Sequence, residues 1–255
     1  MQEIKNGIDR THLKNFFNLL MAVAVIAFVG CSKDDETIEL KQSEVSLYSG
    51  DKFQIEAMSN SGLTFRSENE YHAVVSETGL VTALFVGQTN IVVSDGNDSK
   101  NFRVTIRPKS SLYPEPYINW GASRAEVIAY SGTPDSDDED GLVYNEYANA
   151  DILMYSFDEA DKLKSVGVAI KSSYTSEIST YLSERYLPID ASSESYTILF
   201  VNGISPETTT TLIGAGLLSL SHWMVIYLPY EKSASSLSLE APVQITAKAQ
   251  ALIAK

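Results

Sequence analysis

Residues 65–93 read FRSENEYHAVVSETGLVTALFVGQTNIVV, in which short β-branched runs are separated by glycine-containing turn signals. The pattern extends outward on both sides of this stretch. Alternating or β-branched runs occur from Glu44 to Arg107, and a turn signal follows roughly every 8 to 12 residues. About seven such runs without helical periodicity are typical of a small β-sandwich. We therefore expect an all-β sandwich over residues 37–107.

The same stretch carries a more specific pattern. It resembles the bacterial immunoglobulin-like domains of group 2, which place a hydrophobic-Ser-Ser-Asn element before an alternating strand, a Gly-x-Val-x-Ala element and a further glycine. The residues in these places are Phe65, Ser67, Asn69, Val74, Gly79, Val81, Ala83, Gly87 and Ile91. The resemblance implies an immunoglobulin-like sandwich that serves as a spacer or adhesive module, and it implies no particular ligand.

The N-terminal segment has the features of an export signal. Basic residues precede an apolar run of about 14 residues, 16–29, which is shorter than the roughly 20 residues that span a bilayer. Gly30 and Cys31 follow this run and resemble the lipobox of bacterial lipoprotein signal peptides. The resemblance implies that residues 1–30 are removed and that Cys31, the only cysteine, is lipidated. The alternative is an ordinary buried cysteine after an uncleaved anchor helix.

The acidic tether that follows, residues 31–36, carries a second signal. Lys33, Asp34 and Asp35 resemble the export signal of bacteria that display lipoproteins on the outer face of the outer membrane. The resemblance implies a lipid-anchored outer-membrane protein at the cell surface. A solvated, charged tether is the alternative interpretation, because polar linkers often have this composition.

A second domain follows the sandwich. Residues 108–120 contain three prolines and are predicted to form an extended connector, because the residue before each proline is steered out of the helical region. Ser123 as N-cap and Glu126 as its capping-box partner predict a short helix that stops at Gly132.

A second helix, at residues 175–189, is predicted from apolar residues at helical spacing. Each helix precedes about three strand-like runs, so helix plus three strands occurs twice within residues 121–232. We expect an α+β two-layer domain, an antiparallel sheet with both helices on one face. The tail at residues 233–255 is rich in Ser and Ala and is interpreted as a poorly ordered end.

The first half of this domain resembles known binding folds. GASRAEVIAYSGTP at residues 121–134 and YSFDEADKLKSV at residues 155–166 resemble the small lipoprotein of the outer-membrane barrel-assembly machinery and β-lactamase-inhibitor-like folds. The match covers about 50 residues. It implies a binding or scaffolding domain rather than an enzyme.

Composition excludes several classes of function. The net charge of −14 argues against nucleic acid as a partner, because phosphate neutralisation needs clustered Lys and Arg. A single cysteine excludes an intrachain disulfide framework and any multi-thiolate metal site. Serine catalysis needs a base and an orienting acid, but His72 and His222 lie in different domains and no Gly-x-Ser-x-Gly elbow is present. We expect a chain that is not an enzyme and has no cofactor.

One acidic loop, DSDDEDGLVYNE at residues 135–146, is a weak candidate for calcium. Asp135, Asp137, Glu139 and Glu146 fall at positions 1, 3, 5 and 12 of a calcium-loop frame, but the obligatory glycine comes one place late. The alternative is a solvated acidic loop between the first helix and a strand.

Tyrosine is abundant in the second domain. Most of these rings are expected to fill the core, because they alternate within apolar runs. Tyr113, Tyr117 and Trp120, in the connector, are predicted to be the most exposed aromatic residues and are candidate ligand-binding residues.

Three functional hypotheses follow from these features. The first is a non-catalytic, lipid-anchored cell-envelope protein that acts in adhesion or binds an extracellular protein or glycan. The second is a periplasm-facing scaffold for envelope assembly. The third is a hydrolase that uses a carboxylate pair, for which the acidic loop is the only support.

Overall fold

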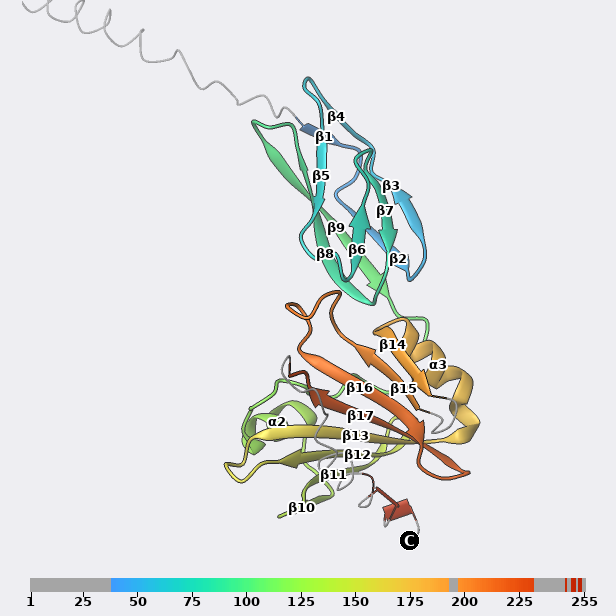
Figure 1. The fold of residues 1–255 in the computed structure, drawn as a ribbon. Coiled ribbons are helices and arrows are strands. Elements are labelled where there is room, and N and C mark those ends of the chain that lie inside the picture. The colour runs from blue at the N-terminus through green and yellow to red at the C-terminus, as the bar shows by residue number, and fades with distance from the viewer. Residues whose placement is uncertain (1–37, 193–196, 232–245, 247–248, 251, 254–255) are drawn as a thin grey trace, which may run out of the picture.

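The computed structural model describes residues 38–192, 197–231, 246, 249–250 and 252–253. Two units follow one another along the chain, and Figure 1 shows them end to end. The predicted signal segment, Cys31, and the export-signal residues Lys33, Asp34 and Asp35 lie outside the described residues. No helix among the described residues is long and apolar enough to cross a membrane.

The first unit, which we call the sandwich unit, is all-β and extends to Arg107. Its strands form a four-stranded sheet in the order β2-β9-β8-β5, a three-stranded sheet in the order β3-β7-β6, and the pair β1-β4. The strands are β1 (Ile38–Leu40), β2 (Glu44–Tyr48), β3 (Lys52–Gln54), β4 (Ala57–Ser59), β5 (Thr64–Ser67), β6 (Ala73–Val75), β7 (Leu80–Ala83), β8 (Gly87–Ser94) and β9 (Ser99–Arg107).

Alternation along the two longest strands builds the core of the sandwich unit. Ile91 and Val93 of β8, and Phe102 and Val104 of β9, have no exposed surface, and the residues between them point outward. This period of two buries one face of each strand, as the sequence predicts. The predicted all-β unit is therefore confirmed.

One alternating run of the sandwich unit is divided between two strands. The run at residues 52–58 forms β3, which pairs with β7, and then β4, which pairs with β1. Ile55 lies at the break and is 3% exposed, so the chain changes partner strand where this side chain turns into the core. Strand β1 was not predicted, because three residues are too few to show alternation.

The second unit, which we call the sheet unit, contains one eight-stranded sheet in which every pairing is antiparallel (Figure 1). The strand order is β10-β11-β12-β13-β17-β16-β15-β14. The elements are α2 (Arg124–Ser131), β10 (Ser136–Asp138), β11 (Gly141–Tyr147), β12 (Ala150–Phe157), β13 (Leu163–Lys171), the 3-10 turn η1 (Ser172–Tyr174), α3 (Thr175–Ser183), β14 (Leu187–Ser192), β15 (Thr197–Val201), β16 (Thr211–Leu217) and β17 (His222–Pro229).

Each half of the sheet unit is a helix followed by four strands, and the last strands of the halves, β13 and β17, pair in the middle. The prediction of three strands per half is therefore wrong. The two missed strands, β10 and β14, are the edges of the sheet. Edge strands are often short and charged or contain proline, and β10 reads Ser-Asp-Asp while β14 contains Pro188. Strand β10 lacks the apolar alternation by which the central strands were predicted, and the first residues of β14, 187–189, were predicted to continue the second helix.

Both predicted helices form, but the second is shorter than predicted. Ser123 is the N-cap of α2, and its side chain and that of Glu126 make the reciprocal bonds of a capping box. The chain leaves α2 at Gly132, where φ is 86°. Helix α3 buries Ile178, Tyr181 and Leu182, but it ends at Ser183 instead of continuing to Ile189.

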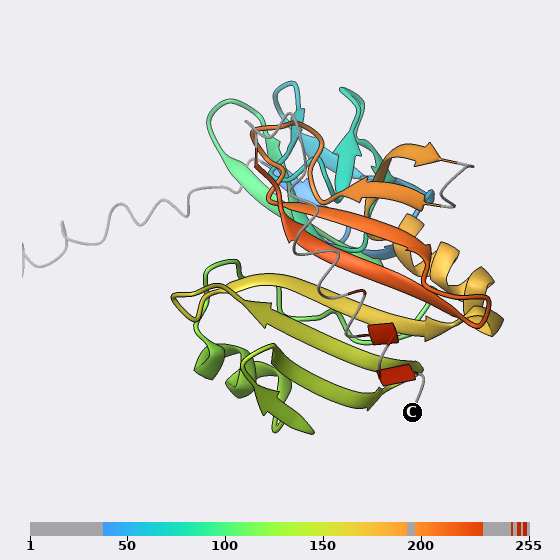
Figure 2. The ribbon, with the colours of Figure 1, turned by 60° about the horizontal axis from the view of Figure 1, so that its bottom comes forward.

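The two faces of the sheet are covered differently. Val127 of α2 and the buried residues of α3 belong to one core with Val168, Val225 and other residues of one sheet face. Figures 1 and 2 show the two helices well apart along this sheet. On the other face, Ala249 and its neighbours Leu252 and Ile253 pack against Met154 and Met224. These described residues of the C-terminal tail are therefore packed, whereas a poorly ordered end was expected.

Candidate binding site between the two units

The end of the sandwich unit nearest the sheet unit is built by two turns. The β5–β6 connection carries Tyr71 and His72, and the β7–β8 connection carries Phe85. Tyr71 stacks on Phe85 with ring centroids 4.6 Å apart, and His72 Nδ1 lies 3.2 Å from the Phe85 carbonyl oxygen. Gly87 has a φ of 142°, and a Cβ there would overlap the His72 ring. Glycine is therefore required where the two turns pack together.

Two hydrogen bonds connect this end to the C-terminus of α3. The backbone N–H of Val86 donates to the carbonyl oxygen of Glu184 at 2.8 Å. The hydroxyl of Tyr71 donates to the carbonyl oxygen of Arg185. These carbonyls follow the last turn of a helix, where carbonyl groups have no intrahelical partner and accept bonds from other segments. The sandwich unit thus completes the hydrogen bonding of α3.

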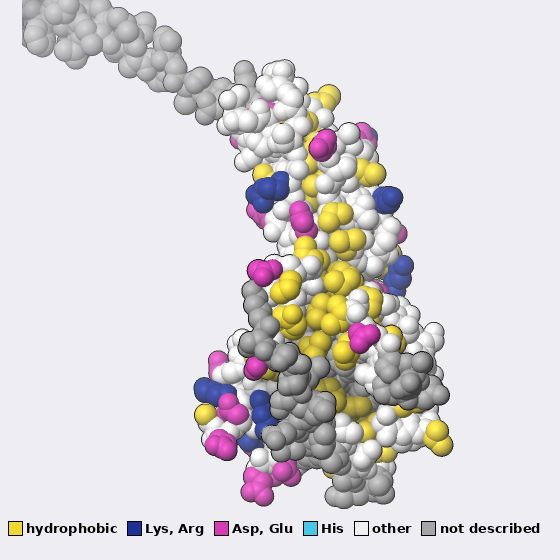
Figure 3. All heavy atoms as spheres, viewed as in Figure 1, with side chains coloured by type: hydrophobic (Ala, Val, Ile, Leu, Met, Phe, Trp, Pro, Cys, Tyr) yellow, Lys and Arg dark blue, Asp and Glu magenta, His cyan; other side chains and the backbone are white. Residues whose placement is uncertain are grey.

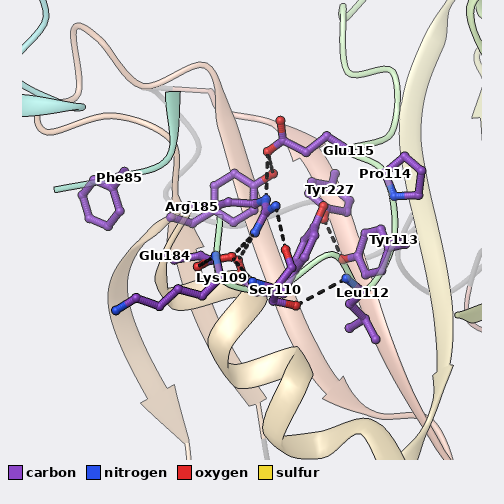
Figure 4. A network of polar contacts seen from close by, with 12 residues as sticks. Phe85, Lys109, Ser110, Leu112, Tyr113, Pro114, Glu115, Glu184, Arg185 and Tyr227 are labelled. Atoms are coloured by element: carbon purple, nitrogen blue, oxygen red, sulfur yellow. Dashed lines mark hydrogen bonds and ion pairs between the residues drawn. The ribbon is translucent and has the colours of Figure 1, made fainter. Parts of the chain in front are cut away.

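Glu184 and Arg185 form a buried ion pair at this junction, shown in Figure 4. Their side chains are 5% and 8% exposed, and Arg185 Nη1 lies 2.6 Å from Glu184 Oε1. The Glu184 carboxylate also accepts hydrogen bonds from the backbone N–H groups of Lys109 and Ser110, at 2.7 and 3.0 Å. Since Lys109 and Ser110 begin the segment that joins the two units, this carboxylate fixes the junction.

The guanidinium of Arg185 is held on several sides. It lies over the Tyr181 ring, 3.9 Å from the centroid, and Nη2 donates to the Ser110 carbonyl oxygen at 3.2 Å. Its Nε atom is buried and makes no hydrogen bond. This Nε points toward Glu115, whose Oε1 lies 3.8 Å away and accepts a hydrogen bond from the Tyr186 hydroxyl at 3.0 Å (Figure 4).

Beside this junction lies a cleft of about 800 Å³, with one wall from each unit. The sandwich unit contributes the β5–β6 connection, and the sheet unit contributes the segment before α2, the end of α3 and the β15–β16 loop. The lining is mostly polar and charged, and its aliphatic members on the sheet unit are Ile118 and Ile204. Loops held on rigid elements are common positions for binding residues. We define this hollow as the interunit cleft.

The Glu115 carboxylate raises the pKa of two tyrosines at the junction. Burial is the main cause that raises the pKa of Tyr186, and the nearby Glu115 carboxylate raises it further. The same two causes act on the pKa of Tyr71. Since the ordinary tyrosine pKa of about 10 is raised further, both hydroxyls are protonated at neutral pH and donate the hydrogen bonds to Arg185 and Glu115.

The aromatic residues predicted to be exposed are packed instead. Tyr113 is 2% exposed, and its hydroxyl lies 2.9 Å from that of Tyr227. Tyr117 and Trp120 are partly buried against the same core, and Trp120 Nε1 donates to Thr211 Oγ1 at 3.0 Å. The expectation of exposure is therefore wrong for Tyr113, whereas Tyr117 and Trp120 keep part of their surface, because the segment at residues 108–120 packs against the core on the helix-bearing side of the sheet.

The acidic loop also differs from its predicted role. Asp137 pairs with Arg124 at 2.6 Å, and Asp135 Oδ2 accepts a hydrogen bond from the Asn145 backbone at 2.7 Å. Glu139 and Glu146 do not join them, and no three His, Cys, Asp or Glu side chains in the described part of the chain form a group that could hold a metal. The loop instead contains the edge strand β10.

The structure brings together a serine, a histidine and an aspartate that the sequence did not reveal as a set. Ser221 Oγ lies 2.9 Å from His222 Nδ1, and His222 Nε2 lies 2.7 Å from Asp151 Oδ2. The order is that of a catalytic triad. However, the backbone N–H groups of Ser221 and His222 already donate to Ser219, so they are not available to stabilise an oxyanion. We interpret these hydrogen bonds as stabilising the β16–β17 turn.

An apolar groove lies on the sheet face opposite the helices. It has a volume of about 260 Å³ and is lined by Leu199, Leu212, Ile226 and Leu228 around the glycines of β16. Figure 3 shows hydrophobic side chains gathered near the place where the two units meet. Gly214 and Gly216 lie within β16, and their lack of side chains leaves the groove open.

The residues that build the interunit cleft were not predicted from the sequence. Glu184 and Arg185 follow the apolar stripe of α3 as adjacent opposite charges, which is ordinary on a helix surface. The only available signal was Arg185 itself, which continues the buried stripe of α3 one turn after Tyr181. Its burial depends on the sandwich unit, which the pattern of the helix does not reveal.

Residues 36–106 match the family model of the bacterial Ig-like domain (group 2). This match confirms the family predicted for the sandwich unit, and it covers less than half of the chain. A search of curated proteins gave no match.

Solved structures give weak similarity. Domains 1–6 of the surface layer protein SbsC are 14% identical, with 80% of this chain and 26% of that chain covered and a TM-score of 0.24. The C-terminal domain of TagH is 11% identical, with 67% and 99% covered and a TM-score of 0.26. The chain thus spans about a quarter of the surface layer protein. TM-scores of this size carry no argument about function.

Proposed function

We propose that this protein is a cell-envelope protein, anchored through a lipid on Cys31 and displayed at the cell surface, that binds an extracellular protein or glycan in the interunit cleft. The observation that supports it most is the cleft itself, whose two walls are joined by the buried pair Glu184–Arg185. Binding sites are usually concave and largely formed before the ligand arrives, and a fixed junction satisfies both conditions. The role is non-catalytic.

The arrangement of the chain agrees with display outward from a membrane. Strand β1 begins seven residues after Cys31, so the intervening chain reaches at most about 25 Å when extended. Figure 1 shows β1 at the end of the sandwich unit that faces away from the sheet unit. The sandwich unit thus acts as a spacer, and the cleft lies at its far end.

Lipid anchoring and surface display are tested on cells. The expected results are incorporation of a tagged fatty acid that is lost in Cys31→Ser, and removal of the protein by protease added to intact cells. An unlabelled wild-type chain contradicts the anchor. Labelling without protease sensitivity contradicts surface display and favours the periplasm-facing scaffold, whose motivation is the resemblance of the sheet unit to an envelope-assembly lipoprotein.

The binding role is tested with a soluble chain that begins at Ser32. Because Cys31 is the only cysteine, a new cysteine can be labelled selectively with a bulky maleimide. Ile204, which is 47% exposed, lies in the cleft, whereas Leu220, which is 97% exposed, lies in the β16–β17 turn and serves as the control. The ligand screen uses arrayed glycans and immobilised extracellular proteins.

We expect the label on Ile204→Cys to abolish binding to a ligand found in this screen, and the label on Leu220→Cys to leave it unchanged. Equal binding by both labelled chains contradicts the cleft as the site. A screen in which the unlabelled chain binds nothing contradicts the binding role.

A further inference from the structure

An exposed aromatic ring lies on the sheet unit, outside the interunit cleft. Tyr130, in the last turn of α2, is 60% exposed. Every other aromatic residue within the described ranges is at least partly buried. A single apolar side chain in solvent is ordinary, but a contiguous group indicates an interaction surface. The neighbours of Tyr130 therefore decide what this ring means.

The nearest aromatic neighbour is Tyr117, whose ring centroid lies 5.0 Å from that of Tyr130 with 39° between the planes. One buried hydroxyl holds both rings in place. Tyr155 Oη accepts a hydrogen bond from the Tyr117 backbone N–H at 3.0 Å and lies 2.9 Å from Oγ of Ser131, the residue after Tyr130. The two rings are thus arranged before any ligand arrives. We define Tyr117 and Tyr130 as the aromatic platform.

A third ring, that of Tyr147, lies beside the platform. Burial raises the pKa of Tyr147, and neighbouring phenols, Tyr130 among them, raise it further. The Tyr147 hydroxyl donates to the carbonyl oxygen of Pro114 at 3.2 Å. The residues on either side of it, Glu146 and Ala148, have positive φ values of 54° and 55°, which side chains with a Cβ seldom adopt. The hairpin therefore holds Tyr147 against the segment that carries Tyr117.

Uncharged polar groups surround the two rings of the platform. Asn119 is exposed, and its Nδ2 donates to the Tyr117 hydroxyl at 3.2 Å. Among the described residues, nothing donates to Asn119 Oδ1, and the Tyr130 hydroxyl makes no hydrogen bond. A ligand can therefore find both a donor and an acceptor beside the exposed aromatic face.

We propose that the aromatic platform binds a hexose unit of a neutral polysaccharide, at a site separate from the interunit cleft. One face of a pyranose ring carries C–H bonds, which pack on the negative face of an aromatic ring. Its hydroxyl groups both donate and accept hydrogen bonds, as do the groups around the platform. Neither Tyr117 nor Tyr130 lines the cleft, so this inference goes beyond the binding function proposed for it.

Other ligand classes fit the platform less well. An anionic polysaccharide is repelled by a chain of net charge −14. A proline ring can also stack on tyrosine, but a proline residue offers only a carbonyl acceptor and leaves Asn119 Oδ1 without a donor. The uncharged surroundings of the two rings therefore favour a neutral sugar.

The test is affinity electrophoresis of the soluble chain in native gels that contain a neutral glucan, mannan, xylan or galactan. A shallow surface encloses little of its ligand, so binding is weak and is measured at equilibrium rather than on a washed array. The acidic chain migrates readily, and its retardation at several polysaccharide concentrations gives the affinity. The variants are Tyr130→Ala, which removes the exposed ring, and Tyr130→Phe, which keeps its face. The control is Tyr48→Ala in the sandwich unit.

We expect at least one polysaccharide to retard the wild-type chain. Tyr130→Ala is expected to weaken this binding by about tenfold, Tyr130→Phe to weaken it less, and Tyr48→Ala to leave it unchanged. The maleimide label on Ile204→Cys is also expected to leave it unchanged. Thermal unfolding of each variant verifies that the fold is kept.

Two results overturn the proposal. The first is a wild-type chain that none of the polysaccharides retards, or that binds decaproline in their place by calorimetry. The second is retardation that Tyr130→Ala does not weaken. If the Ile204 label abolishes that retardation, the sugar lies in the interunit cleft, so the platform is wrong while the function proposed for the cleft stands.

Discussion

At the scale of single residues, the junction depends on one carboxylate. Glu184 accepts hydrogen bonds from two backbone N–H groups of the segment between the units and pairs with Arg185, while its own backbone carbonyl accepts from Val86. A buried charge is tolerated only when its hydrogen bonds are complete, and the Glu184 carboxylate has its partners in the neighbouring Arg185 and in the segment that joins the units. Glu184 therefore couples the folding of α3, the connecting segment and the sandwich unit.

Replacing Glu184 by alanine leaves the buried Arg185 without its partner. We expect Glu184→Ala to lower the free energy of unfolding by about 3 to 5 kcal/mol, measured by denaturant unfolding. The double variant Glu184→Gln with Arg185→Met removes both charges and is expected to cost less than the single variant. A loss below about 1 kcal/mol in Glu184→Ala would show that the pair does not hold the junction.

Gly87 is the second residue on which the cleft wall depends. In Gly87→Ala, the alanine must keep a positive φ and its Cβ overlaps the His72 ring. In Gly96→Ala, the alanine must also keep a positive φ, but no atom lies within 4 Å of its Cβ. We expect Gly87→Ala to be less stable than Gly96→Ala by about 1 to 3 kcal/mol. Equal unfolding midpoints for the two variants would mean that the His72 contact is absent.

At the scale of elements, the extended segment at residues 108–120 behaves as part of the sheet unit. Its prolines predicted an extended chain, and the structure has no helix or strand at these residues. Its burial could not be predicted, because an extended segment without alternation gives no signal of the surface it covers. Tyr113 contacts Tyr181 of α3 and Tyr227 of β17, so one layer of tyrosines joins the segment, the helix and the sheet.

These tyrosines predict a loss of stability in alkali. Burial raises the pKa of Tyr113, Tyr186 and Tyr227 in the folded chain, so their contribution is present below the unfolded pKa of about 10 and is lost as pH rises above it. Each tyrosine is expected to lower the free energy of unfolding by about 1.4 kcal/mol per pH unit above about pH 10. Denaturant unfolding at several alkaline pH values measures the slope.

The matched variant is Tyr227→Phe, which removes one ionisable group and is expected to reduce this slope by about 1.4 kcal/mol per pH unit. Tyr117→Phe, in a partly buried ring, serves as the control. An unfolding free energy that stays constant above about pH 10 would contradict buried, protonated tyrosines.

At the scale of the whole molecule, the sequence predicted the parts better than their assembly. The sandwich unit was recognised from Gly79, Gly87 and the alternation around Ile91, because its register is set by local turns. The capping box at Ser123 and the buried stripe of α3 were also local signals. The cleft was not predicted, because its walls come from residues 66–72, 86, 115–118 and 185–208, which share no sequence pattern and meet only when both units are folded.

The sandwich unit is a spacer that is held fixed against the sheet unit. A flexible connector would let the two units turn independently, whereas Glu184, Arg185 and Tyr71 fix them through buried bonds. A fixed junction keeps both walls of the cleft in place without a ligand, which lowers the entropic cost of binding.

The distance between the two units tests most directly whether the junction is fixed. Spin labels on Glu77→Cys in the sandwich unit and Leu220→Cys in the sheet unit, in a Cys31→Ser chain, report that distance as a distribution. The account predicts one narrow distribution for the otherwise wild-type chain and a broad one when Glu184→Ala is added. A broad distribution without that substitution would contradict a preformed cleft.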